Sequence, residues 1–136
     1  MVALLKHRSR KETVMNAPAN ANVWAEIPVT DLAKAKDFYG AVTGYAMIDQ
    51  DMGPNRTAVF AYTGDGGVAG HLYEGRPAPA GTGPTVHLAV SGTTEEAMQR
   101  VRDAGGQVVS PVIEIPAGRF AYCLDPDGNS FGVFAA

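Results

Sequence analysis

The sequence from Val23 to Tyr45 reads VWAEIPVTDLAKAKDFYGAVTGY, and its pattern returns from Thr85 to Gln107 as TVHLAVSGTTEEAMQRVRDAGGQ. Each copy begins with apolar residues at every second position, an alternation typical of a strand whose two faces meet different surroundings. Each copy then passes into a segment of helical spacing and ends at glycine. The two copies predict two strand–helix units of the same design.

The copies superimpose at an offset of 61 residues, which carries Trp24 onto Thr85 and Glu26 onto His87. The same offset aligns the glycines that close the two helical segments. We interpret the pattern as an internal duplication, so the fold is expected to consist of two similar modules.

The composition limits both the size of the fold and its partners. A chain of 136 residues suffices for one domain with a single core. Apolar residues make up 46% and charged residues 18%, and the 16 glycines and 9 prolines favour a turn-rich globular protein with many short strands. The formal net charge of −3 gives no general attraction to nucleic acid or to a membrane surface, so neither is expected as a partner.

The single cysteine and the first residues bear on location. Cys123 cannot form an intrachain disulfide, which favours a reducing compartment, and we expect this thiol to fill the core. Residues 1–21 contain the basic run KHRSRK and no apolar periodicity, so they predict a disordered tail, and Met15 is an alternative natural start. No stretch has the length of a signal-peptide core or a membrane span, so we expect a cytoplasmic protein.

The remaining chain, 22–136, is expected to be one domain of two modules. Module one (22–74) holds a helix over about 31–42 that ends at Gly44, and then strands. A stiff linker (75–84) leads to module two (85–136), whose helix opens with the capping box Thr93-x-x-Glu96. The expected later strands are 45–51, 57–62 and 68–73 in module one and 108–115, 119–124 and 130–134 in module two.

Several short motifs give the chain a family resemblance. The segment Val29-Thr-Asp-Leu32, the pair Phe38-Tyr39, and the closing turn Asp125-Pro-Asp-Gly-Asn129 occur in the order and spacing of the vicinal oxygen chelate superfamily. That superfamily includes glyoxalase I, fosfomycin- and bleomycin-resistance proteins and extradiol dioxygenases. The end pattern is most similar to uncharacterised glyoxalase-related proteins of bacteria.

The resemblance implies an α+β fold in which two β-α-β-β-β modules form a cupped mixed sheet of about eight strands. Helices would lie outside the cup and a small organic ligand would bind inside it. The resemblance also implies a homodimer and an activity related to lyases, isomerases or dioxygenases. A sequestering protein of the bleomycin-resistance kind is the non-catalytic alternative.

The alternation places candidate catalytic groups inside the cup. The sets Val23, Ala25, Ile27, Val29 and Val86, Leu88, Val90 are expected beneath the helices, so the intervening side chains face inward. Glu26 and His87 then occupy equivalent points, and a carboxylate and an imidazole can form an acid/base pair. The structural alternative is a hydrogen-bonded pair with no role in chemistry.

The metal positions implied by the resemblance are poorly filled. They fall on Trp24, Thr85 and Gly132, none of which is a good ligand, and the fourth falls on His71. We therefore predict no metal or other cofactor. An unorthodox site built from Glu26, His71 and His87 is the alternative, and would support a metal-dependent lyase or dioxygenase.

The remaining candidates are expected to contact the substrate. They are Trp24, His71, Thr85, Tyr122 and Arg119. Trp24 is either a stacking surface for a planar ligand or a plug that closes the cup. Tyr122 lies where the resemblance places a pocket tyrosine in fosfomycin-resistance proteins, although a core aromatic is the alternative. Arg119 could hold an anionic ligand, although arginines at strand ends are usually solvated.

Overall fold

The computed structural model describes residues 16–136, which contain two helices and nine strands. The prediction of a disordered tail over 1–21 lies mostly outside the described residues, since only 16–21 of that segment are described. Those six residues precede the first strand. Neither helix within 16–136 is long and apolar enough to cross a lipid bilayer.

The first module forms a four-stranded sheet, here called sheet A. β1 (Ala25–Val29) leads into helix α3 (Leu32–Thr43), which is followed by β2 (Ile48–Met52), β3 (Asn55–Val59) and β4 (Gly70–Glu74). The spatial order is β1-β4-β3-β2, with β1 parallel to β4 and the other neighbours antiparallel. The first strand of the module therefore lies beside its last strand.

The second module repeats this plan in a five-stranded sheet, here called sheet B. The elements in chain order are β5 (Val86–Ala89), α4 (Thr94–Asp103), β6 (Gln107–Val108), β7 (Ile113–Ile115), β8 (Gly118–Leu124) and β9 (Ser130–Ala135). The order is β5-β9-β8-β6, and the short β7 also pairs with β8. As in sheet A, the first strand is parallel to the last.

Both helices are capped at their N-termini, and the cap of α4 is the predicted capping box. Asp31 accepts a hydrogen bond of 3.0 Å from the backbone N–H of Lys34, and Thr93 and Glu96 form a complete capping box. Helix α3 ends at Gly44, whose φ of 81° lies in the left-handed region that glycine enters without steric cost.

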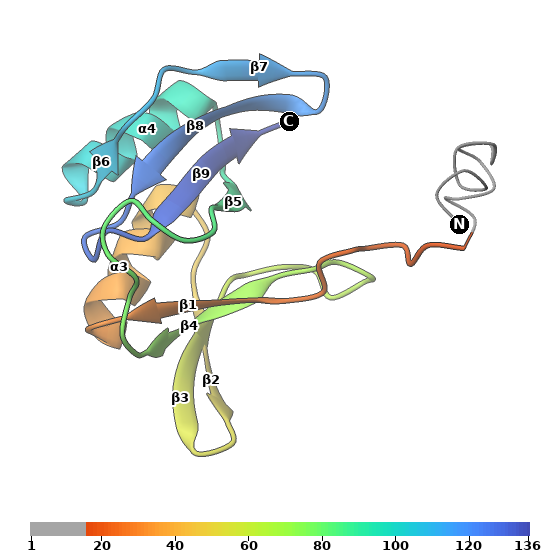
Figure 1. Ribbon diagram of the computed structural model, residues 1–136, viewed down its shortest axis with the longest axis vertical. Helices are drawn as coiled ribbons and strands as arrows, with labels where there is room; N and C mark the ends of the chain where they lie inside the picture. Colours follow the sequence, from red (N-terminus) through yellow and green to blue (C-terminus); the bar gives the residue numbers. More distant parts are fainter. Residues whose placement is uncertain (1–15) are drawn as a thin grey trace, which may run out of the picture.

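The helices cover one face of each sheet and meet in one shared core. Figure 1 shows both helices on the same side of the molecule, with sheet A in the lower half and sheet B in the upper half. Tyr39 of α3 packs edge-to-face against Phe60 of the first module and Phe131 of the second, with ring centroids 5.6 Å and 5.3 Å apart. The two modules therefore share one hydrophobic cluster.

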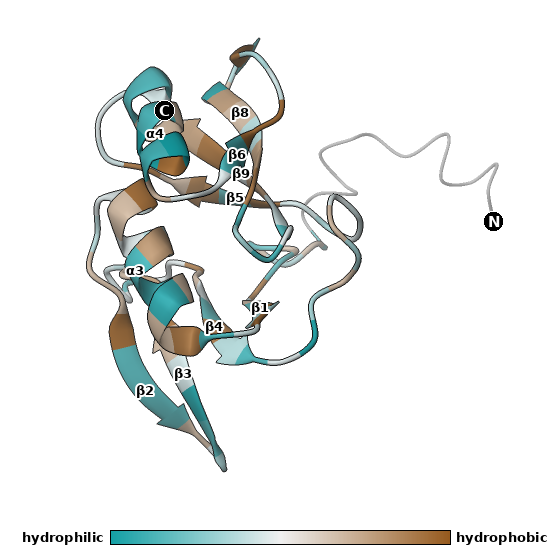
Figure 2. Ribbon diagram, turned by 90° about the vertical axis from the view of Figure 1, so that its left-hand side faces the viewer, coloured by the Kyte–Doolittle hydropathy of each residue, from teal (hydrophilic) through white to brown (hydrophobic). Residues whose placement is uncertain are grey.

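The β2–β3 hairpin extends beyond this core. Figure 2 shows hydrophilic residues over most of β2 and at the tip of the hairpin. Four of the five residues of β2 are exposed. The part of the hairpin that leaves the core is thus polar, as solvent exposure requires.

The predicted α+β class is confirmed, but the sheet arrangement differs from the prediction. The strands form two hydrogen-bonded sheets instead of one, because β1 and β5 each pair only with the last strand of their own module. Ile27 and Val29 are buried as predicted. Val23 was expected in the core and is 73% exposed, because it precedes the first residue of β1.

The strand predicted over 108–115 is also wrong as a single element. It consists of β6 and β7, separated by a segment that contains Ser110 and Pro111. Proline has no backbone N–H to donate to a strand ladder, which explains the interruption. The strand predicted over 57–62 begins and ends earlier, as β3.

The carboxylate of Asp125 joins the two modules. Asp125 lies in the β8–β9 turn of module two and is 5% exposed. It accepts a hydrogen bond of 2.6 Å from the hydroxyl of Tyr39 in α3, and bonds of 2.9 Å from the backbone N–H groups of Asp127 and Asn129. The pKa of Tyr39 is raised by burial and by the charge of Asp125, so the hydroxyl keeps the proton that it donates.

The rest of the same turn holds the junction between β1 and α3. The carboxylate of Asp127 accepts from the backbone N–H of Thr30 at 3.0 Å and from its hydroxyl at 2.6 Å. The side-chain amide of Asn129 donates to the carbonyl of Pro28 at 2.9 Å. The motif Asp125–Asn129 is therefore a hairpin turn that also fastens module two to module one.

Replacing Tyr39 by Phe tests this connection. The variant keeps the ring but leaves a buried carboxylate one donor short, so we expect the free energy of unfolding to fall by about 1–3 kcal/mol. Tyr45→Phe is the matched control, because Tyr45 is 47% exposed, and it should change stability by less than about 0.5 kcal/mol. Urea denaturation of both variants measures the difference, and equal effects would contradict the role given to Tyr39.

Candidate functional site

Each sheet has one face against the helices and one face turned away from them, which we call its open face. Leu72, Ala58 and Ile27 lie in the core, so their neighbours along the strands project from the open face of sheet A. These neighbours, with the residue that precedes β1, are Trp24, Glu26, Pro28, Thr57, Val59, His71 and Tyr73. Three of the candidate residues therefore lie together on sheet A.

His71 lies at the centre of this face, opposite Glu26 on one neighbouring strand and Val59 on the other. It is only 5% exposed. Its Nδ1 accepts a hydrogen bond of 2.8 Å from the indole N–H of Trp24, and its Nε2 lies 3.3 Å from Oε1 of Glu26. We call these three side chains the Trp24–His71–Glu26 cluster.

The indole N–H determines the protonation of His71. An indole nitrogen can only donate, so the Nδ1 that receives its hydrogen bond has no proton. A neutral imidazole must then carry its proton on Nε2, beside the Glu26 carboxylate. The cluster therefore holds a neutral His71 whose Nε2–H faces a carboxylate.

Glu26 is oriented by this contact but stays accessible. Its side chain is 66% exposed, whereas the side chain of His71 is 6% exposed. The ring of Tyr62 packs edge-to-face on Trp24 at 5.9 Å, and the ring of Tyr73 lies 6.1 Å from His71. A carboxylate that water and ligand can reach thus shares the open face with these aromatic rings.

The open face of sheet B has a different character. His87 of β5 lies among three aromatic rings, with centroid distances of 4.8 Å to Phe120, 5.7 Å to Tyr122 and 6.2 Å to Phe134. A Cβ on Gly132 would collide with the ring of His87, so the ring lies directly over that glycine. We call His87 and its three aromatic neighbours the sheet B aromatic cluster.

The duplication explains how the two faces correspond. Glu26 stands opposite His71 across β1 and β4, and His87 stands opposite Gly132 across β5 and β9. Both pairs are related by the offset of 61 residues. Each module therefore has one histidine at this cross-strand pair. His71 lies on the last strand of module one, and His87 lies on the first strand of module two.

The predicted pairing of Glu26 with His87 is not what the structure brings together. Glu26 contacts His71 of its own sheet, and the ring of His87 contacts the aromatic rings of sheet B. The residue as a whole is exposed, but one face of its ring is covered. This partial burial lowers the pKa of His87 below the ordinary histidine value. His87 is thus held mainly as a neutral ring at neutral pH.

Tyr122 and Thr85 also lie on sheet B. Tyr122 is 36% exposed beside His87, so it is not a fully buried core aromatic. The hydroxyl of Thr85 shares a hydrogen bond of 2.6 Å with that of Ser130. Both residues therefore belong to the open face, with Thr85 already engaged by its neighbour.

Arg119 lies on the opposite face from the other candidates. Its guanidinium makes two hydrogen bonds, of 2.9 and 2.8 Å, to the carboxylate of Glu95 in α4, and a third of 3.1 Å to Glu114. Ala121, two residues further along β8 and therefore on the same face as Arg119, lies in the core. Arg119 is therefore occupied in ion pairs on the helix side of sheet B, away from Tyr122.

The residues at the family's metal positions do not fit a metal ion. The indole of Trp24 has no lone pair to offer, Gly132 has no side chain, and Thr85 is bonded to Ser130. His71 offers Nδ1 to the indole instead of to a metal. Within 16–136 the structure gathers no group of three or more His, Cys, Asp or Glu side chains suited to a metal, so Glu26, His71 and His87 do not converge.

A separate hollow of about 400 Å³ lies on the helix side of sheet A, between α3 and the β2–β3 hairpin. Charged residues of both signs line it, including Lys36, Asp49 and Arg56. Lys36 and Asp49 are already paired at 2.8 Å. Because the candidate residues are on the opposite face, we do not assign the chemistry to this hollow.

The structure adds residues that the sequence analysis did not single out. Tyr62, Phe120 and Phe134 supply rings around Trp24 and His87. Phe120 and Phe134 follow period two from Tyr122 and Gly132, so alternation alone could have placed them on the open face. Tyr62 lies beyond the end of β3, where alternation gives no guide.

Replacing His87 by Gln tests the surroundings of its ring. Because the folded-state pKa of His87 is lowered, the unfolded chain binds this proton more readily. The free energy of unfolding should therefore fall as the pH drops below about 6.5 toward the folded-state value. Thermal melts between pH 8 and pH 5 should show a smaller loss for the variant, and identical pH profiles would contradict burial of the ring.

Comparison with known proteins connects this geometry to a family. A protein of Mycobacterium tuberculosis (strain CDC 1551 / Oshkosh), CFP32, whose name refers to a glyoxylase, is 30% identical over 118 residues. The match covers 83% of this chain, and the chain spans only 44% of the length of that relative.

Solved structures agree on the fold. A glyoxalase/bleomycin resistance protein from Streptomyces sp. CB03234 has a TM-score of 0.59 and 26% identity, covering 85% of this chain and 100% of the other. The fosfomycin resistance protein FosX from Mesorhizobium loti has a TM-score of 0.60, covering 88% of this chain and 94% of its own. At 14% identity the second likeness concerns the fold alone.

The family profile of these proteins matches residues 22–133, which is nearly all of the described chain. The chain belongs to the glyoxalase/bleomycin resistance protein/dioxygenase superfamily.

Proposed function

We propose that this protein binds a small organic molecule on its open faces and that Glu26 acts there as an acid/base group without a metal. The observation that carries the proposal is the Trp24–His71–Glu26 cluster, in which a buried neutral histidine orients an accessible carboxylate. Family membership supports a small-molecule ligand, and the unsuitable metal positions support chemistry by side chains. The proposed reaction class is proton transfer of the lyase or isomerase type.

Each residue of the cluster has a separate part in this chemistry. Glu26 accepts a proton from the ligand on the carboxylate oxygen that does not face His71. The Nε2–H of His71 lies beside the other oxygen and positions it. Trp24 fixes His71 as the neutral form by donating to Nδ1. Trp24 and His71 therefore act as positioning residues, and Glu26 as the catalytic residue.

Sequestration without turnover is the second candidate function. The sheet B aromatic cluster favours it, because it offers stacking surface and a histidine that burial keeps neutral. Such a surface can hold a planar ligand without transferring a proton.

Glu26→Gln separates the two functions. The variant keeps the shape of the side chain but cannot accept a proton, so turnover of any substrate found by screening small organic compounds should fall about 100-fold or more. Glu74→Gln is the matched control, since Glu74 is an exposed carboxylate at the far end of β4, and its rate should stay within about twofold. Turnover that survives Glu26→Gln would contradict the proposed base, and sequestration predicts binding with no turnover in either protein.

A second prediction concerns metal content. Protein purified without chelator should contain less than about one tenth of an equivalent of zinc, nickel, manganese or iron, because a site with one or two donors loses its ion readily. Elemental analysis measures this content. One equivalent of a transition metal that disappears in His71→Ala or His87→Ala would contradict the proposal and favour the metal-dependent alternative.

We also propose that the protein is a homodimer, as the family resemblance implies. The outer strands β1, β2 and β5 each have a free edge that a second copy can cover. Sedimentation equilibrium at micromolar concentration should give about twice the chain mass, and a single species of 14.2 kDa would contradict the dimer. A cytoplasmic location remains a prediction from the single cysteine.

A further inference from the structure

The charges on the strands are divided unequally between the two faces of the sheets. Among residues 16–136, the strands carry two cationic side chains, Arg56 and Arg119. Arg56 lines the hollow against α3, and Arg119 is paired with Glu95 of α4, so both lie on the helix side. The open faces therefore present no strand-borne cation to a ligand.

Glu26 is the exposed carboxylate of the open face of sheet A. The other strand-borne acids of sheet A lie elsewhere: Asp49 and Glu74 line the hollow on the helix side, and Asp51 stands opposite Arg56. Because Trp24 keeps His71 neutral, the histidine does not cancel the charge of Glu26. The cluster thus carries one net negative charge.

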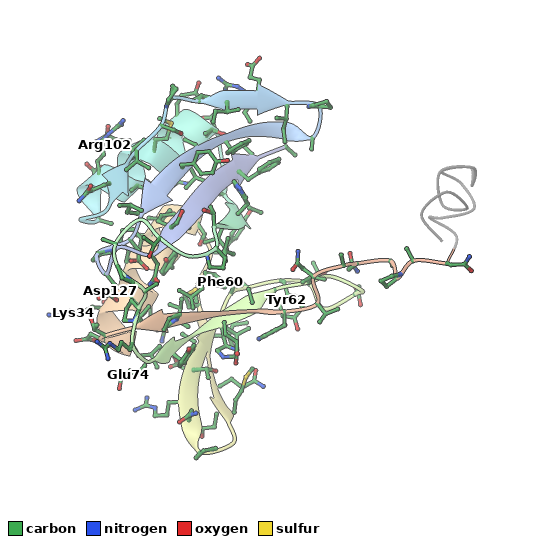
Figure 3. All side chains as sticks on the ribbon, in the orientation of Figure 1. Lys34, Phe60, Tyr62, Glu74, Arg102 and Asp127 are labelled. Carbon is green, nitrogen blue, oxygen red and sulfur yellow. The ribbon has the colours of Figure 1, made fainter. Side chains whose placement is uncertain are left out.

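Aromatic rings lie next to Trp24 and His71 on the same open face as this charge. The indole of Trp24 contacts Tyr62 at 5.9 Å and His71 at 6.0 Å, and Tyr73 continues the row at 6.1 Å from His71. Trp24 and Tyr73 are half-buried and Tyr62 is 44% exposed, so parts of their rings remain available. Figure 3 shows Tyr62 at one end of sheet A and Glu74 at the other.

A carboxylate among aromatic rings is the arrangement that recognises an organic cation. The π faces attract a positive charge, most strongly for tryptophan, and the carboxylate adds a direct ionic contact. The same arrangement repels a carboxylate or phosphate, which would need the arginines that the fold keeps on the helix side. The overall charge of −3 acts in the same direction over longer distances.

We infer that the ligand of the open face of sheet A is an organic cation, an alkyl- or arylammonium ion whose charged group lies between Glu26 and the rings of Trp24 and Tyr62. This inference names the ligand class of the site and rests on the function proposed above. It assigns Glu26 a role in selecting the ligand as well as in proton transfer.

The chain contains its own probe of this site. Trp24 is the only tryptophan, so its indole N–H gives a single resonance in a ¹H–¹⁵N spectrum and its emission is the only tryptophan fluorescence. Three ligands of similar size and different charge are titrated into the full-length protein: benzyltrimethylammonium, benzyl alcohol and benzoate. The expected result is that the ammonium ion shifts the Trp24 resonance and binds about tenfold or more tightly than either of the others.

Two variants test whether the charge of Glu26 itself, rather than the overall charge of the protein, determines the affinity for the ammonium ion. Glu26→Gln should reduce the affinity for benzyltrimethylammonium about tenfold and remove its advantage over benzyl alcohol. Glu74→Gln keeps the same change in net charge but lies on the helix side, so it should leave both affinities within about twofold.

The titrations test the preference for a cation separately from the presence of a small-molecule site on sheet A. If benzoate or benzyl alcohol binds as tightly as the ammonium ion, or if Glu26→Gln leaves the ammonium affinity unchanged, the cation preference is overturned while the proposed small-molecule site stands. If none of the three ligands shifts the Trp24 resonance at millimolar concentration, both the inference and the proposed site on sheet A are overturned.

Discussion

The hydrogen bond from Tyr39 to Asp125 is the constraint on which the rest of the structure depends. It crosses from the first helix to the last turn, and Asp125 also holds its own turn through two backbone N–H groups. The same turn also fixes the start of α3, because the carboxylate of Asp127 accepts two hydrogen bonds from Thr30. A buried carboxylate is costly unless its oxygens are satisfied, so the modules are held in the one arrangement that supplies these donors. The positions of the open faces follow from that arrangement.

The two modules have equivalent cross-strand positions on their open faces, but different residues at these positions give the two faces different chemistry. Module one puts a carboxylate opposite a histidine, whereas module two puts a histidine opposite a glycine. Gly132 is needed because the ring of His87 occupies the space that a Cβ would take. The result is one charged face flanked by aromatic rings and one aromatic face with a neutral histidine.

Much of this could be predicted from the sequence, and the failures have physical causes. The end of α3 at Gly44, the capping box of α4 and the burial of Ile27 and Val29 follow from local pattern, and the structure contains all of them. The offset between the two modules placed His71 at the position equivalent to Gly132, but periodicity cannot say which ring nitrogen meets which partner. The structure does not bring Glu26 and His87 together, because they lie on separate sheets. Local pattern also could not show that Arg119, expected to hold an anionic ligand, is paired with Glu95 of α4.

The chemistry proposed for the open face depends on Trp24 keeping His71 neutral, with its proton on Nε2, so that Glu26 is an oriented and uncompensated carboxylate. Long-range ¹H–¹⁵N spectroscopy of the histidine rings at pH 7 measures this directly. We expect His71 to show an unprotonated Nδ1 and a protonated Nε2, and we expect Trp24→Phe to disturb this pattern while Tyr45→Phe does not. A His71 ring protonated on both nitrogens, or on Nδ1 alone, would show that Trp24 does not set its protonation.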